Sequence, residues 1–160
     1  MRQRDEAFEA FFMAEHGPVL RTVTLILGDR QAAEDVTQEA FYRLLVHWRK
    51  VSAYERPGAW LRRVAIRAAM RSRAQSQRSE PPPDRAQSDD AASRLDVREA
   101  LGHLTPAQRS AVVLFYYEDH PVNEVASLMN CTEGTVKTHL HRARARLAPM
   151  LGEEIDDVAR

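Results

Sequence analysis

The segment from residue 121 to 146, PVNEVASLMNCTEGTVKTHLHRARAR, constrains the fold more than any other stretch of this chain. Its first part has an apolar face at helical spacing, made of Val125, Ala126 and Met129. Asn130 follows, and its short amide side chain tolerates the left-handed conformation that ends many helices. Thr132 can then cap a second helix. The pattern predicts two short helices joined by a tight polar corner.

The second of these helices is basic. Its predicted inner positions are Val136 and Leu140, and no acidic residue follows Glu133 within the segment. Its cations are Lys137, Arg142, Arg144 and Arg146. A helix–turn–helix with a cationic second helix suits the DNA major groove, where Lys and Arg reach base edges and phosphates. The alternative is a solvated helical hairpin at the end of a bundle.

Length and composition indicate a globular protein of one or two domains. The chain has 160 residues, of which 23 are basic and 23 acidic. No apolar run approaches the ~20 residues that span a bilayer, so we expect no membrane partner. The N-terminus lacks the apolar core and cleavage site of a signal peptide. The single cysteine, Cys131, cannot form an intramolecular disulfide, which fits a reducing compartment and a cytoplasmic location.

Charge is distributed unevenly although its sum is zero. Residues 56–79 contain seven arginines and no acid; they are Arg56, Arg62, Arg63, Arg67, Arg71, Arg73 and Arg78. Attraction to phosphate acts over a Debye length of about 8–10 Å, so a local patch matters more than the net charge. Such a patch favours neutralisation of a nucleic-acid backbone over simple solubilisation of a helix.

The first half of the chain, residues 1–73, follows the 3.6-residue period of helices. The predicted helices are Asp5–Glu15, Pro18–Leu27, Arg30–Arg49 and Ala59–Arg73, with a loop from Val51 to Gly58. Gly28 is predicted to close the second helix and Asp29 to cap the third. The apolar stripe of the third is Ala33, Val36, Ala40, Phe41, Leu44, Leu45 and Trp48. The fourth is predicted to bury Trp60, Leu61, Val64, Ala65 and Ala68.

The second half, residues 95–151, is predicted to be a separate helical domain. Residues 74–94 contain three consecutive prolines and no large apolar residue, so a flexible linker is expected there. Thr105 and Gln108 form a capping box before a helix over residues 106–118. That helix is predicted to bury Val112, Val113, Phe115 and Tyr116, and Pro149 is predicted to end the last helix. Residues 152–160 form an acidic tail. The predicted fold class is all-α, with two small helical domains.

Three motifs resemble those of extracytoplasmic-function sigma factors, the small initiation factors of bacterial RNA polymerase in the sigma-70 family. The stretch GTVKTHLHRARARL is similar to the promoter-reading end of these proteins. Residues 33–41, AEDVTQEAF, are similar to a second signature of the family. The third is Pro57 followed by Trp60-Leu61 and Val64-Ala65 before an arginine-rich helix. The resemblance covers about residues 5–150, with the first domain similar to sigma region 2 and the second to region 4.

The resemblance implies a polymerase-binding surface on the helix over residues 30–49. Asp35, Gln38 and Glu39 match the family residues that dock on the clamp helices of the largest polymerase subunit, and Arg43 flanks them. Region 4 would in turn meet the flap of the core enzyme. Without the resemblance, the sequence would indicate only that these polar residues form a solvated face of the helix.

The resemblance also implies two DNA-binding surfaces. Region 2 would open the −10 element and hold it with Tyr54, Arg56, Arg62, Arg63, Arg67 and Arg71. Tyr54 could stack on a base or cap the hydrophobic core. Region 4 would read the −35 element with Thr132, Thr135, Lys137, Thr138, His141, Arg142 and Arg146. Arg142 and Lys137 can bind guanine, while the amides of Thr132 and Thr135 suit a phosphate.

Catalytic and metal-binding patterns are missing from the sequence. His139 and His141 point about 200° apart on a helix, and His120 and Cys131 lack further ligands at zinc spacing. We therefore expect no enzyme activity, no cofactor and no metal. One departure from the family pattern is the Pro121 that stands where relatives have a capping Ser or Thr, a change that costs about 1 kcal/mol.

These observations predict an alternative sigma factor that directs core polymerase to specific promoters and helps open them, with an anti-sigma factor as a candidate partner. One alternative is a sigma-like mimic, which would bind an anti-sigma factor instead of DNA. A second is a helix–turn–helix repressor. The repressor would not explain the signature over residues 33–41 or the arginine-rich helix.

Overall fold

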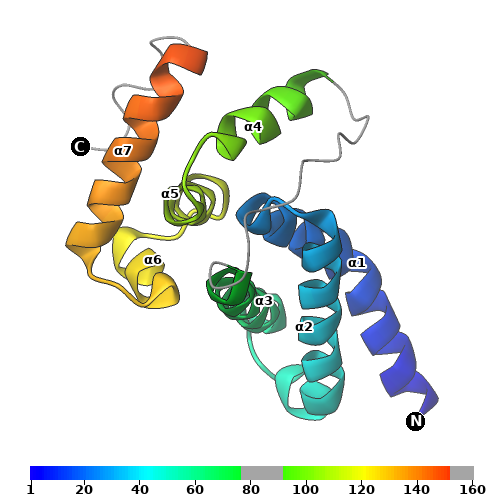
Figure 1. Ribbon diagram of the computed structural model, residues 1–160. Helices are drawn as coiled ribbons and strands as arrows, with labels where there is room; N and C mark the ends of the chain where they lie inside the picture. The colour runs from blue at the N-terminus through cyan, green and yellow to red at the C-terminus, as the bar shows by residue number, and fades with distance from the viewer. Residues whose placement is uncertain (77–91, 152–160) are drawn as a thin grey trace. The chain divides into compact units, whose positions relative to one another are not determined.

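The computed structural model describes residues 1–76 and 92–151, and every regular element within these ranges is helical. The chain divides into two compact units at Pro82–Pro83, here called unit 1 and unit 2. The predicted all-α fold with two helical domains is confirmed (Figure 1). Among the described residues, no helix is both long and apolar enough to cross a membrane.

Unit 1 is a bundle of three helices, each of which packs against the other two (Figure 1). They are α1 (Arg2–Leu27), α2 (Arg30–Val51) and α3 (Pro57–Ser76). The centre of the core consists of Val19, Val23, Ile26, Leu44, Leu61 and Ile66. At one end of the bundle, aromatic rings from α1 close the core against α2, with Phe8 and Phe11 on Trp48 and Phe12 on Phe41.

The prediction of two helices before Gly28 is wrong, because α1 runs unbroken through Pro18. Proline removes one backbone donor and crowds the preceding turn. The helix continues because both of its halves are held by packing: the phenylalanines contact α2, and Val19 and Val23 are buried. Gly28 ends the helix as predicted, in the left-handed conformation with φ 70°.

Helix α2 begins at the predicted cap. The carboxylate of Asp29 accepts hydrogen bonds from the amides of Gln31 and Ala32, at 2.9 and 3.4 Å. The predicted apolar stripe is buried except at Leu45, which is 55% exposed, so that assignment is wrong. Leu45 lies one position past Leu44, and the helical turn of 100° per residue carries its side chain beyond the core.

Thr37 occupies the core of unit 1 at a position that the sequence pattern did not include. The residue is fully buried, and its hydroxyl oxygen has no hydrogen-bond partner within the described residues. A buried polar atom without a partner costs about 1–3 kcal/mol in lost hydration. The hydroxyl of Thr22 is also buried but donates to the Pro18 carbonyl oxygen at 3.2 Å.

We expect Thr37→Val to stabilise unit 1 by about 1 kcal/mol, since it replaces an unpaired hydroxyl with a methyl group of similar size. Urea denaturation followed by tryptophan fluorescence would measure the change, since Trp48 and Trp60 both lie in unit 1. Thr22→Val is the matched control, and it should give no gain because its hydroxyl is paired. Equal effects of the two substitutions would contradict the assignment.

Helix α3 begins at Pro57, inside the predicted loop, and it continues to Ser76. Leu61, Ala65 and Ala68 are buried as predicted, but Trp60 and Val64 are only half-buried. The core instead includes two residues that the prediction left out, Ile66 and Ala69. Helical residues also occupy both ends of the predicted linker, up to Ser76 and from Ala92 onward. The remainder of the linker and the acidic tail lie outside the described residues.

Unit 2 contains α4 (Ala92–Gly102), α5 (Pro106–Val112), π-helix η1 (Val113–Tyr117), α6 (Val122–Met129) and α7 (Glu133–Leu151). Helix α7 packs against α5 and α6. The capping box is confirmed: the Thr105 hydroxyl accepts from the Gln108 amide, and the Gln108 side chain accepts from the Thr105 amide, both at 3.2 Å.

The predicted helix over residues 106–118 changes to a π-helix after Val112. The Glu118 amide donates a hydrogen bond to the Val113 carbonyl oxygen at 3.0 Å. This oxygen lies five residues back, as in a π-helix, instead of four as in an α-helix. An extra residue per turn shifts the faces, so the burial prediction is only partly right. Val113 is buried, Val112 and Phe115 are half-buried, and Tyr116 is 38% exposed.

The prediction that Pro149 ends the last helix is wrong, because α7 continues through it to Leu151. Proline carries no amide hydrogen and deprives only one carbonyl, four residues back, of its partner. In the final turn of a helix this loss is small, since water reaches the carbonyls there.

Candidate functional site

The corner between α6 and α7 is built as the sequence predicts. Asn130 ends α6 in the left-handed conformation, with φ 54° and ψ 50°. The backbone then turns, and the Cys131 amide donates to the Ala126 carbonyl oxygen at 3.0 Å. The Thr132 hydroxyl oxygen accepts from the Thr135 amide at 3.1 Å and so caps the start of α7. In Figure 1, α6 meets the first turn of α7 through this short connection.

Helix α7 has one apolar face and one polar face. Its inner face consists of Val136, Leu140, Ala143 and Leu147, all buried. The residues predicted to contact the −35 element are all exposed, namely Thr132, Thr135, Lys137, Thr138, His141, Arg142 and Arg146. At 100° per residue, Thr138 and His141 lie opposite the buried face, with Arg142 beside them. Lys137 and Arg146 lie at the two edges. The exposed face can therefore present donors to a groove.

Three threonines of this face already make hydrogen bonds. The Thr135 amide is used by the Thr132 cap, and the two hydroxyl oxygens lie 2.9 Å apart. The Thr138 hydroxyl donates to the Gly134 carbonyl oxygen at 3.0 Å. A phosphate at this end of α7 would therefore meet threonine hydroxyl groups, while the Thr135 amide stays in the cap.

Arg144 differs from the other cations of α7. Its guanidinium donates to the Tyr116 hydroxyl of η1 at 3.0 Å, and its side chain is half-buried. The ring of Tyr116 is held in turn by Phe115, edge to face at 4.9 Å. Arg144 therefore ties α7 to η1, a role that its position in the basic segment did not indicate.

The start of α6 has no side-chain cap, as the departure at Pro121 predicts. His120 compensates: its Nδ1 lies 2.8 Å from a carboxylate oxygen of Glu124. Glu124 is the third residue of α6, the position from which a capping-box side chain reaches back to the preceding backbone. In this chain it reaches a side chain instead, and the contact fixes the entry of the helix.

We expect His120→Ala to destabilise the start of α6 by about 0.5–1.5 kcal/mol, the net value of one hydrogen bond. Amide hydrogen exchange of residues 122–129 in the full chain would measure the loss of protection. His103→Ala is the control, because His103 is exposed and its side chain makes no hydrogen bond or ion pair within the described residues. Unchanged exchange in His120→Ala would show that the contact is not structural.

The predicted polymerase-binding residues share the exposed side of α2. Asp35, Gln38, Glu39 and Arg43 are all exposed. Three large apolar side chains extend the same face toward the end of the helix: Tyr42 at 66%, Leu45 at 55% and Val46 at 61% exposure. Leu45 was predicted to be buried, whereas Tyr42 and Val46 stand outside the predicted apolar stripe and were not assigned to any surface. The face combines an acidic part with an apolar part.

Glu39 connects this face to α3. One of its carboxylate oxygens lies 3.1 Å from the Arg43 guanidinium on α2 and 3.7 Å from the Arg71 guanidinium on α3. All three side chains are about half exposed. Arg71, which the sequence assigns to DNA, is thus paired with a residue assigned to the polymerase.

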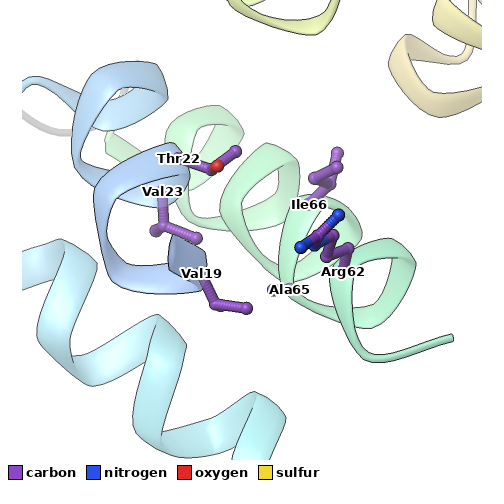
Figure 2. Close-up of a pocket in the computed structure, with 6 residues that line it drawn as sticks. All are labelled: Val19, Thr22, Val23, Arg62, Ala65 and Ile66. Atoms are coloured by element: carbon purple, nitrogen blue, oxygen red, sulfur yellow. The ribbon is translucent and has the colours of Figure 1, made fainter. Parts of the chain in front are cut away.

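The four arginines of α3 that are predicted to bind DNA differ in their ion pairs. Arg62 is paired with Glu15 of α1 at 3.4 Å, and Figure 2 shows it beside Ala65 and Ile66, across a shallow hollow from Val19. Arg63 and Arg67 are exposed and make no ion pair within the described residues. Together with Arg71 they form a row at four-residue spacing, here called the arginine row.

The loop before α3 contributes the remaining predicted contacts. Tyr54 is 39% exposed and Arg56 is also exposed. Tyr54 is therefore not part of the buried core, and its proposed role in stacking on a base stays a prediction. No group of three or more metal-ligating side chains occurs among the described residues.

Two family models match the chain. Residues 11–79 match Sigma-70 region 2, and residues 94–147 match Sigma-70 region 4. The first match lies in unit 1 and the second in unit 2.

Similar proteins cover most of the chain. The RNA polymerase sigma-E factor of Streptomyces coelicolor is 32% identical over 147 residues, which span 88% of this chain and 83% of that protein. The ECF RNA polymerase sigma factor SigM of Mycobacterium tuberculosis is 30% identical over 155 residues, or 91% of this chain and 78% of that protein. The fold is shared with the sigma factor RpoE of Bartonella quintana, solved with the anti-sigma factor NepR. That likeness has a TM-score of 0.61 at 23% identity and covers 94% of this chain and 99% of that one. By both its sequence and its fold, this chain belongs to the extracytoplasmic-function sigma factors of RNA polymerase, within the sigma-70 family.

Proposed function

We propose that this protein directs core RNA polymerase to a specific set of promoters and helps to open them. Unit 1 would bind the core enzyme and the −10 element, and unit 2 the −35 element. The protein would work in the cytoplasm, where polymerase acts, and would have no catalytic activity or cofactor of its own. The observation that carries the proposal is the division of α7 into a buried apolar face and an exposed face with Thr138, His141 and Arg142.

The α2 face is proposed to dock on the clamp helices of the largest polymerase subunit. Asp35, Gln38 and Glu39 would accept hydrogen bonds and pair with cations. Burial of the neighbouring Tyr42, Leu45 and Val46 would stabilise the complex by about 25 cal/mol for each Å² of apolar surface removed from water. A mixed surface of this kind gives specificity through its charges and affinity through its apolar part. Unit 2 is proposed to meet the flap.

The two DNA surfaces are proposed to use different chemistry. On α7, Arg142 and Lys137 can bind guanine edges in a major groove, and Arg146 a phosphate. On α3, the arginine row and Arg56 would neutralise phosphates, each contact steepening the salt dependence of binding by about 0.7–0.9 in the log–log slope. Tyr54 would stack on an unpaired base of the −10 element.

An anti-sigma factor is proposed as a further partner, since the Bartonella quintana sigma factor was solved with one. The apolar part of the α2 face would suit such a protein, and its binding would exclude the polymerase. The mimic alternative receives less support, because a protein that never touches DNA has no need of Lys137, Thr138 and Arg142 on the exposed face of α7.

Selection from genomic DNA would test the proposal. Sheared fragments are incubated with core polymerase alone or with core polymerase and this protein, and the retained fragments are sequenced. We expect the protein to enrich a two-part motif with a constant spacing. Enrichment identical to that of core alone, although the protein binds core, would overturn the proposal and favour the mimic.

A further inference from the structure

Glu39 lies where the proposed polymerase surface and the proposed −10 surface meet. Its side chain belongs to the exposed face of α2, yet one of its carboxylate oxygens is within 3.7 Å of the Arg71 guanidinium on α3. No other residue of that face, among those described, has an ion pair to α3. The pair is therefore a direct link between two binding surfaces.

Only one of the three residues of the arginine row takes part in this link. Arg63 and Arg67 make no ion pair within the described residues, so their charges are available to a phosphate. Arg71 has a carboxylate beside it, which lowers the attraction that a phosphate feels at that end of the row. The free protein thus presents the row with one of its three charges partly neutralised.

The Glu39 carboxylate is also shared. Arg43 contacts the same oxygen at 3.1 Å, so Glu39 keeps one cation of its own helix whether or not Arg71 is present. About half of each of the three side chains is exposed, which lets a partner reach them and lets them move. A donor from a docked protein can replace the longer contact, that to Arg71, at little structural cost.

We infer that Glu39 couples polymerase docking to DNA binding by exchanging its ion-pair partner. When a hydrogen-bond donor of the polymerase engages Glu39, Arg71 is released and completes the arginine row for the DNA backbone. Conversely, a phosphate bound to Arg71 leaves Glu39 open to the polymerase. The inference rests on the proposed function, since it assumes that the α2 face docks on core.

Thermodynamic linkage requires the coupling between polymerase binding and DNA binding to be reciprocal. Two ligands that each release the same ion pair must strengthen the binding of one another by the same factor. The size is bounded by the strength of an exposed ion pair, which corresponds to a change of about two- to five-fold in a binding constant. Higher salt screens the pair, so the coupling should fade as ionic strength rises.

The first test measures the binding of full-length variants to core polymerase in the absence of DNA. Arg71→Gln should bind core about two- to five-fold more tightly than the unmodified protein, since Glu39 is then free of its α3 partner. The control is Arg21→Gln, which removes an equal charge from an exposed position on α1. Equal or weaker binding of Arg71→Gln relative to Arg21→Gln would overturn the inference.

The second test measures the reciprocal effect with a 12-nucleotide single-stranded DNA of mixed sequence and no polymerase. Glu39→Gln should bind it about two- to five-fold more tightly than Glu34→Gln does. The two variants are matched, because each removes one negative charge and one i,i+4 pair from α2, Glu34 being paired with Arg30 at 3.2 Å. Equal affinities would overturn the inference.

Failure of the inference can be told from failure of the proposed function. If Asp35→Lys weakens core binding but Arg71→Gln does not change it, the docking face stands and the coupling is wrong. If Asp35→Lys leaves core binding intact, the docking face itself is wrong, and the inference falls with it.

Discussion

Replacing Asp35 with Lys is expected to weaken the binding of core RNA polymerase by about 2–5 kcal/mol, or at least 30-fold. Asp35 is exposed on α2 and makes no ion pair within the described residues. Its reversal therefore breaks no ion pair among the described residues, whereas it puts a cation where the proposed partner presents donors. Titration of labelled core with the variant, at fixed salt, would give the affinity.

The control for this prediction is Glu9→Lys, which makes the same charge change on an exposed position of α1 in the same unit. It should bind core within about two-fold of the unmodified protein, because isolated surface charges contribute little. Circular dichroism should show equal helicity in both variants. Undiminished binding by Asp35→Lys would exclude this face as the docking surface. The double variant with Asp35→Lys and Glu39→Lys would be harder to interpret, because the second substitution also removes the ion pairs of Glu39 with Arg43 and Arg71.

Replacing Arg142 with Ala is expected to cost about 1–3 kcal/mol in promoter binding and to relax the preference at one base pair of the −35 element. Arg142 is exposed next to the centre of the polar face of α7, where a bidentate contact to guanine is possible. The measurement is a binding series of the holoenzyme on promoter variants, each with one −35 base pair changed.

Arg146→Ala provides the comparison, because Arg146 lies on the same helix at the edge of the face. A phosphate contact there should weaken binding evenly across all the variants and lower the salt slope by about one. Loss of base preference in Arg146→Ala but not in Arg142→Ala would show that the helix lies in the groove in another orientation.

Local signals predicted much of the fold. Asp29, Gly28, Thr105, Asn130 and Thr132 all cap or end helices where the sequence places them. Each acts through its own side chain or through a backbone conformation that only a few residue types adopt easily, so the signal is contained in a few consecutive positions. For the same reason the missing cap before α6 could be recognised at Pro121.

The errors come from features that depend on packing at a distance. Pro18 lies inside α1 because both halves of that helix pack against other elements. Pro149 lies inside the last turn of α7, where water can hydrate the carbonyl that lacks a partner. A rule based on proline alone includes neither effect. The π-helix rotates Tyr116 out of its predicted buried position, where it meets Arg144 instead. A strict helical period cannot foresee an inserted residue.

The candidate site could be predicted as a set of residues but not as a set of contacts. The exposed face of α7 and the acidic part of α2 lie where the motifs place them. The pairing of Glu39 with Arg71 and of Arg62 with Glu15 joins residues far apart in the chain, so no spacing rule could reveal it. Those contacts show which arginines are already partnered before any DNA arrives.

Run-off transcription tests the central claim most directly, since it requires docking, promoter recognition and opening together. Core polymerase is incubated with sheared genomic DNA and nucleotides, with or without this protein, and the 5′ ends of the transcripts are mapped. We predict a discrete set of start sites that appears only with the protein and is strongly reduced by Asp35→Lys or Arg142→Ala. The same start sites with and without the protein would contradict its assignment as a promoter-directing factor.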